Sequence, residues 1–126
     1  MKTAHDLVVE AKPCVKEISI DQAVHAIQSC DVLIDVRETE EYLAGHLPGA
    51  IHMSRGMLEF KMAGNPKMQP RDLTIVLYCK TSGRAALSAK SLVEMGYTHI
   101  QSIAGGIDAW VAAGHEVFKP TQPSFE

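Results

Sequence analysis

A cysteine begins a short polar loop with the sequence Cys79-Lys80-Thr81-Ser82-Gly83-Arg84. The uncharged apolar run before it, residues 73–78, contains several β-branched side chains and predicts a strand buried on both faces. After the loop, apolar residues recur at helical spacing and predict a helix over 85–95. The loop therefore joins the carboxyl end of a buried strand to a helix N-terminus, which is where ligands bind in parallel α/β sheets.

The residues of this loop favour nucleophilic chemistry on an anionic substrate. Unpaired backbone N–H groups and the helix dipole favour an anion at a helix N-terminus. Lys80 and Arg84 add two positive charges, and the sequence has no acidic residue between Asp72 and Glu94. Such surroundings stabilise a thiolate, which is the form of cysteine that attacks. We expect Cys79 to be a nucleophile; the alternative is a small buried core residue, as cysteines often are.

Length and composition are those of one globular domain. The chain has 126 residues, of which 46% are hydrophobic and 21% charged. A net charge of -3 argues against general nucleic-acid binding, which needs a basic surface. No stretch has the length of a membrane span, and the first residues lack an apolar signal segment, so we expect a cytoplasmic location without membrane contact.

The sequence has three cysteines and six histidines, and neither set forms a metal-binding pattern. An odd number of cysteines without an export signal predicts free thiols. Cys14 and Cys30 lie beside ordinary helix or loop signals, and we expect them to be structural. No metal or organic cofactor is expected.

The remaining patterns predict strands that alternate with helices. Strands are expected at 17–18, 31–35, 50–52, 73–78 and 98–103. Helices are expected at 3–11, from a capping box at Ser19 through Ser29, after a Thr39 cap, over 56–62, over 85–95 with Gly96 at the end, and after Gly105-Gly106. This alternation predicts an α/β fold with a mostly parallel sheet between helices. The methionine-rich segment 53–68 could line a binding surface, but packing on the sheet is the more usual role.

Four motifs in a fixed order carry a resemblance to a known family. They are Leu33-Ile34-Asp35-Val36-Arg37-Glu38 with Glu41-Tyr42, Gly45-His46-Leu47-Pro48-Gly49-Ala50, Tyr78-Cys79, and Gly105-Gly106-Ile107-Asp108-Ala109-Trp110 with Gly114. Together these motifs resemble the single-domain form of the rhodanese family of sulfurtransferases. The resemblance covers about residues 16–116, which leaves an N-terminal extension, 1–15, and an irregular C-terminal tail, 117–126, with Pro120 and Pro123.

The resemblance implies a single α/β domain with a five-stranded, mainly parallel sheet flanked by helices on both faces. It also implies that Cys79 is the nucleophile and that Lys80, Thr81, Ser82, Gly83 and Arg84 form the active-site loop. In such enzymes the thiolate takes the outer sulfur of a donor such as thiosulfate, releases sulfite, and passes the sulfur from a persulfide to cyanide or a thiol. The expected partners are therefore a thiosulfate-like anion and a cyanide or thiol acceptor, including a thiol on a protein.

Two other functions are weighed against this one. The related phosphatases and arsenate reductases have five residues between Cys and Arg, whereas four separate Cys79 from Arg84, which favours sulfur over phosphorus. A binding or regulatory module of low turnover is the second alternative, because Ser82 stands where active family members commonly have glycine. If that position needs a positive φ, serine is strained there; we favour Gly83 taking that conformation instead.

The motif residues outside the loop receive structural roles. Asp35, Arg37 and Glu38 are expected to form an ion pair or loop anchor, with Arg37 as a candidate for the pocket wall. His46, before the Pro48-Gly49 turn, is expected to donate an orienting hydrogen bond instead of acting as a general base. Trp110 is expected in the core.

Overall fold

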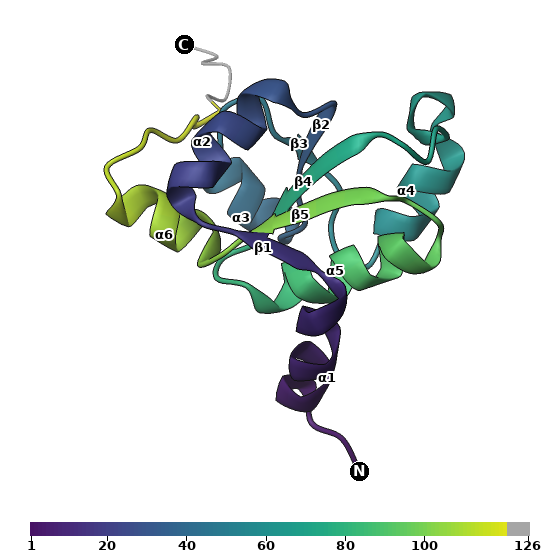
Figure 1. The fold of residues 1–126 in the computed structure, drawn as a ribbon. Helices are drawn as coiled ribbons and strands as arrows, with labels where there is room; N and C mark the ends of the chain where they lie inside the picture. Colours follow the sequence, from purple (N-terminus) through teal and green to yellow (C-terminus); the bar gives the residue numbers. More distant parts are fainter. Residues whose placement is uncertain (121–126) are drawn as a thin grey trace.

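In a computed structural model of the chain, which describes residues 1–120, five strands form one sheet between two layers of helices (Figure 1). The strands are β1 (Lys16–Ile18), β2 (Val32–Asp35), β3 (Ile51–His52), β4 (Thr74–Tyr78) and β5 (His99–Ile103). The helices are α1 (Ala4–Ala11), α2 (Ile20–Ser29), α3 (Thr39–Ala44), α4 (Leu58–Gly64), α5 (Gly83–Glu94) and α6 (Gly106–Ala112), with 3₁₀ turns η1 (Lys12–Cys14) and η2 (Pro66–Met68). The predicted α/β class is confirmed.

The strand order is β1-β5-β4-β2-β3, and every neighbouring pair is parallel. β4 therefore lies in the middle, where its side chains are buried on both faces. In the β2–β4 register, Asp35 is the partner of Tyr78. The segments that follow these two residues, beginning at Val36 and Cys79, leave the same edge of the sheet side by side.

Each face of the sheet has its own hydrophobic core. On one face, α4 and α5 cover β2 and β4, with these buried residues: Val32, Ile34, Leu58, Met62, Ile75, Leu77, Ala85, Ala89 and Leu92. On the other face, α2 and α6 pack on the sheet through Ala23, Leu33, Val76, Tyr78, Ile103, Ile107 and Trp110. The predicted core position of Trp110 is confirmed, and its indole N–H donates to the Glu116 carbonyl at 2.8 Å.

Local sequence signals set most helix ends. The Ser19 hydroxyl accepts from the Gln22 N–H while the Gln22 side chain accepts from the Ser19 N–H, as the capping box predicts. At the end of α5, Gly96 has a φ of 99° and donates to the Val93 carbonyl, so it follows the helix in the left-handed conformation.

Helix starts differ from the prediction at α3 and α4, and α5 begins at Gly83 instead of Ala85. The N-cap of α3 is Glu38, not Thr39, and its N–H donates to the Glu41 carboxylate at 3.1 Å. The sequence favours Thr39 because threonine is a commoner capping residue than glutamate. α4 begins at Leu58 instead of Gly56; Leu58 is fully buried, whereas Met57 before it is exposed.

The methionine-rich segment packs mainly against the domain. Met53 and Met62 are buried in the core beside α5, and Met68 packs partly against it. Met57 is half-exposed. The segment therefore contributes mostly to the core, as the more usual role of such residues suggests.

The two terminal segments have different surroundings. α1 projects from the domain and packs against α5 (Figure 1). Residues 117–120 are less irregular than predicted, because Phe118 and His46 exchange two backbone hydrogen bonds of 2.9 and 2.7 Å. Pro123 lies outside the described residues. Between residues 1 and 120, no helix is long and apolar enough to cross a membrane.

Candidate active site

Cys79 lies directly after the last residue of β4, and only 1% of its surface is exposed. Its Sγ accepts a hydrogen bond from the backbone N–H of Ala85, in the first turn of α5, at 3.4 Å. A helix N-terminus stabilises negative charge on a group in this position. The buried strand end thus holds the sulfur against the positive end of a twelve-residue helix.

The backbone N–H groups of residues 80–84 have no hydrogen-bond acceptor within residues 1–120. The carbonyls on the same loop are occupied: the Cys79 carbonyl accepts from the Ile107 N–H at 2.9 Å, and the Lys80 carbonyl accepts from the Asp108 N–H at 3.1 Å. In a trans peptide the N–H points opposite to the carbonyl of the preceding residue. The N–H groups of Lys80 and Thr81 therefore point away from α6 and are free for an anion.

The loop is formed without a left-handed residue. Ser82 has φ −150° and ψ −20°, and no residue other than glycine has a positive φ within residues 1–120. Gly83 is not among the glycines of positive φ, so the prediction that it takes the special conformation is wrong. It is instead the first residue of α5, where an ordinary helical backbone suffices. A Cβ at Gly83 would lie 3.4 Å from the Val8 side chain of α1.

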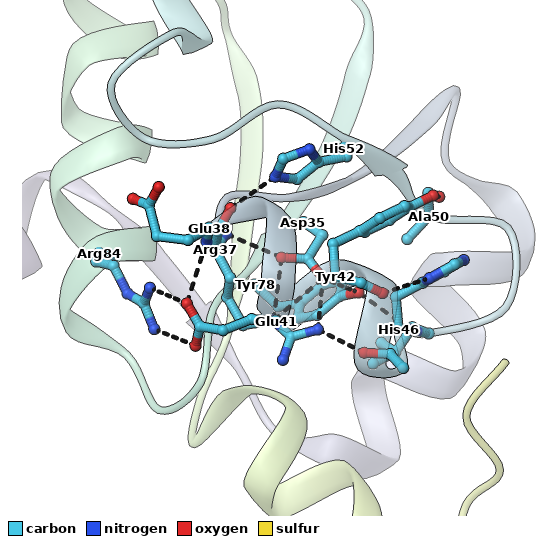
Figure 2. A network of polar contacts seen from close by, with 12 residues as sticks. Asp35, Arg37, Glu38, Glu41, Tyr42, His46, Ala50, His52, Tyr78 and Arg84 are labelled. Carbon is cyan, nitrogen blue, oxygen red and sulfur yellow. Dashed lines mark hydrogen bonds and ion pairs between the residues drawn. The ribbon is translucent and has the colours of Figure 1, made fainter. Parts of the chain in front are cut away.

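Arg84 is held by a carboxylate from another helix (Figure 2). Its Nη1 lies 2.6 Å from Oε1 of Glu41 and its Nη2 lies 3.0 Å from Oε2, which is a bidentate pair. Hydrogen bonding to Arg84 lowers the pKa of Glu41 to about 2. The same hydrogen bonds raise the pKa of Arg84.

Lys80 has a similar partner. Its Nζ lies 2.7 Å from a carboxylate oxygen of Asp108, and 61% of the Lys80 side-chain surface is exposed. The expectation of a surplus of positive charge at the loop is therefore wrong, because α3 and α6 bring two acids to a segment that has none of its own. The unpaired N–H groups of residues 80–84 are then the positive groups that the loop itself presents.

Arg37 lies next to the loop in a buried ion pair (Figure 2). Asp35, which is fully buried, accepts from the Arg37 backbone N–H, from its guanidinium at 2.8 Å, and from the Tyr78 hydroxyl at 2.7 Å. Arg37 also donates to the Gly45 carbonyl at 2.6 Å. Burial and the Asp35 charge raise the pKa of Tyr78. The predicted ion pair is thus present between Asp35 and Arg37, whereas Glu38 caps α3 instead, and the Tyr78 hydroxyl ties the end of β4 to that of β2.

Two histidines, His46 of the second motif and His52 of β3, bond to backbone carbonyls. The Nδ1 of His46 lies 3.1 Å from the Tyr42 carbonyl, and the Nε2 of His52 lies 2.7 Å from the Arg37 carbonyl. Because a carbonyl only accepts, each of these nitrogens carries a proton and donates. In the described part of the chain, no histidine hydrogen-bonds to Cys79, so His46 orients the backbone as predicted.

A cleft of about 550 Å³ opens beside Lys80. Its lining is mainly apolar, with four charged side chains among the ten residues: Arg37, Glu41, Ala44, Gly45, Lys80, Ile107, Asp108, Val111, Ala112 and Val117. Arg37 therefore lies in a cleft wall, at the place that the sequence suggests. The cleft lies on the α6 side of the loop, and Cys79 is not among the residues that line it.

The other thiols have no comparable surroundings. Cys14 is exposed, and Cys30 is half-buried at the end of α2. Burial raises the pKa of the Cys30 thiol, which disfavours its reactive form. In the stretch from residue 1 to residue 120, no three His, Cys, Asp or Glu side chains gather as a metal site would require.

Comparison with known proteins identifies the family. The model of the rhodanese-like domain matches residues 19–113. The chain belongs to the rhodanese-like domain family. The resemblance seen in the four sequence motifs is thereby confirmed.

The relatives of this rhodanese-like chain include sulfurtransferases. The thiosulfate sulfurtransferase GlpE of Pseudoalteromonas translucida is 37% identical over 80% of this chain and 93% of its own length. The polysulfide-sulfur transferase homodimer of Wolinella succinogenes is 34% identical, with a TM-score of 0.74 over 91% of this chain and 86% of that one. A Rhodopseudomonas palustris protein of unknown function, described as a possible tyrosine phosphatase, is 30% identical with a TM-score of 0.83 over 94% and 96% of the two chains.

Sequence reasoning missed three residues around the rhodanese-like loop: Glu41, Asp108 and Gly106. All three lie inside the quoted motifs, but the motifs do not show which residues they contact in the fold. Glu41 and Asp108 neutralise the two loop cations. A Cβ on Gly106 would lie 2.6 Å from the Thr81 carbonyl oxygen, so this residue meets the loop backbone directly.

Proposed function

We propose that the chain is a sulfurtransferase that carries sulfane sulfur as a persulfide on Cys79. The observation that supports this most is the position of the Cys79 Sγ, 3.4 Å from the Ala85 N–H, beside a loop whose N–H groups at 80–84 have no acceptor within residues 1–120. This arrangement suits a thiolate that receives an anionic sulfur donor.

In the first step, the Cys79 thiolate attacks the outer sulfur of thiosulfate. The new S–S bond forms as the donor's own S–S bond breaks, and sulfite leaves with the electron pair. The loop N–H groups hold the negative oxygens in the donor and in the departing sulfite. Electrons balance within the donor and the thiolate, so the step needs no added oxidant.

In the second step, cyanide or a thiolate attacks the outer sulfur of the Cys79 persulfide. The product is thiocyanate or a new persulfide, and the Cys79 thiolate is restored. A thiol on another protein is an acceptor of the same chemistry.

The names of two relatives support this donor class. One is a thiosulfate sulfurtransferase and the other a polysulfide-sulfur transferase. Thiosulfate and polysulfide are both anions with a terminal sulfur that a thiolate can attack. We therefore propose a thiosulfate-like anion as donor for this chain.

The alternatives have less support. The strain argument for a low-turnover module loses its basis, because Ser82 has a negative φ. A phosphatase is favoured only by the description of one structural relative, while four residues between Cys79 and Arg84 make a smaller ring than phosphatases use. Sulfur transfer remains the proposal that accounts for the loop.

The test is intact-protein mass spectrometry after incubation with thiosulfate. We expect the mass of one sulfur atom to be added to the wild type and removed by dithiothreitol. Cys79→Ser should take up none, whereas Cys14→Ser and Cys30→Ser should behave like the wild type. Sulfur uptake by Cys79→Ser would refute the proposal, as would hydrolysis of an aryl phosphate by a wild type that takes up no sulfur.

A further inference from the structure

Three successive carbonyl groups of the active-site loop converge on one glycine of α6. A Cβ placed on Gly106 would lie 2.3 Å from the Cys79 carbonyl oxygen, 2.7 Å from that of Lys80 and 2.6 Å from that of Thr81. Real Cβ atoms do not approach oxygen so closely. The loop backbone therefore packs against Gly106 where any other residue would have its Cβ.

The next two residues of α6 reinforce this contact. The N–H groups of Ile107 and Asp108 donate to the Cys79 and Lys80 carbonyls at 2.9 and 3.1 Å. Since all peptide bonds of residues 1–120 are trans, each carbonyl turned toward α6 turns the following N–H away from it. The orientation of the carbonyls thus fixes the orientation of the N–H groups at Lys80, Thr81 and Ser82.

We propose that Gly106 is a positioning residue that holds the loop N–H groups in the geometry needed for sulfur transfer. It acts through the loop carbonyls and does not contact the substrate. The inference rests on the proposed function for its catalytic readout, but its effect on the loop can be measured on the thiol itself.

A matched control separates this contact from ordinary backbone strain. Gly106 has a φ of 56° and Gly114, just beyond the same helix, has a φ of 85°. Alanine is disfavoured by the backbone at both positions. A Cβ at Gly114, however, meets no atom within 4 Å. Gly114→Ala therefore introduces a comparable backbone strain without the contact with the loop.

The experiment compares Gly106→Ala with Gly114→Ala at a temperature where both remain folded. We expect Gly106→Ala to lower kcat/KM for thiosulfate by roughly 100-fold, because misplacing a reacting group by ~1 Å costs that much. Gly114→Ala should change it by less than about threefold. The pH profile of Cys79 alkylation by iodoacetamide should shift in Gly106→Ala and match the wild type in Gly114→Ala.

Two outcomes would overturn the proposal. One is equal loss in the two alanine variants; the other is an unchanged alkylation profile in Gly106→Ala. If the wild type takes up no sulfur, the proposed function fails, yet the alkylation profile still decides the role of Gly106. If Gly106→Ala does not fold, amide exchange of the wild type decides: protected N–H groups at Ile107 and Asp108 support the proposal, and exchange as fast as at chain ends refutes it.

Discussion

Arg84 of α5 and Glu41 of α3 form a bidentate ion pair across 43 positions of sequence, with N–O distances of 2.6 and 3.0 Å. The pair joins the first turn of the helix behind the loop to a helix from the first half of the chain. The positive charge of Arg84 is therefore already neutralised by Glu41 when a donor binds. The charge that an anion experiences depends on both members of the pair.

We predict that Arg84→Ala weakens thiosulfate use by ~1–3 kcal/mol, because it leaves the Glu41 carboxylate unpaired beside the loop. The double variant Glu41→Gln/Arg84→Ala should recover part of this loss, since it removes the repelling charge. Steady-state kcat/KM for thiosulfate measures both. Glu40→Gln, an exposed change on the same helix, is the control for net charge. Equal losses in the single and double variants would contradict the prediction.

A second prediction concerns acid stability. The folded-state pKa of Glu41 is about 2, below its ordinary value of 4.5, so its pair with Arg84 stabilises the protein fully above pH ~4.5. This contribution is lost as the pH falls from there through 2. Because the pair is about one-third exposed, we expect ~0.5–1 kcal/mol.

Urea unfolding of the wild type and Glu41→Gln between pH 2 and pH 7 checks the acid effect. The difference in the free energy of unfolding should be constant near neutrality and shrink steadily between pH 4.5 and pH 2. A difference that persists unchanged at pH 2 would show that the carboxylate charge is not its source.

Lys80 should act more weakly and with a stronger salt dependence. It is mostly exposed and already paired with Asp108, so we expect Lys80→Ala to raise KM for thiosulfate by less than about tenfold. Kinetics at low and at high ionic strength provide the measurement. The difference in KM between wild type and Lys80→Ala should shrink as salt screens the Lys80 charge. A difference that does not depend on salt would point to a direct contact between Lys80 and thiosulfate.

For Ser82→Gly we expect a change in sulfur transfer of less than about threefold. The φ of Ser82 is −150°, a value that requires no glycine, so the substitution relieves no left-handed strain. Thiosulfate:cyanide turnover is the assay. A large gain in rate would show that serine restrains the loop in some other way.

Asp35→Asn should be among the most damaging changes away from the loop. It would leave the buried Arg37 guanidinium without its charge partner and weaken the bond from Tyr78, at a cost of ~3–5 kcal/mol. Chemical denaturation gives the value. Tyr78→Phe, which removes one hydroxyl of the same network, is the milder comparison and should cost ~1–3 kcal/mol. Equal, small losses of unfolding free energy in the two variants would contradict the prediction, because they would show that Arg37 does not depend on the Asp35 charge.

Local patterns were sufficient for the secondary structure that surrounds the loop. A charge-free run predicted β4, and a capping box predicted α2, because the physics of both lies within a few residues. The end of β4 then placed Cys79 before a helix. The error at the N-cap of α3 is also a local one, because Glu38 takes the capping position beside Thr39 and pairs with Glu41 three residues later.

The charges of the site could not be predicted in the same way. Every charged residue between Asp72 and Glu94 is positive, yet the fold brings Glu41 and Asp108 to the loop. Likewise, a pair of glycines predicts a turn, but it does not predict that three loop carbonyls pack closely against Gly106. Contacts between segments about 30 or 40 residues apart are set by packing, which a linear pattern does not contain.

The pairing of β1 with β5 has a consequence for how the chain folds. β1 lies near the amino end, and its one strand neighbour within residues 1–120, β5, is synthesised after most of the domain, whereas β2, β3 and β4 can pair earlier. Such long-range pairing closes a large loop and slows folding. We expect a growing chain to assemble the strands that lead to Cys79 first, while β1 stays unpaired until β5 emerges to complete the sheet.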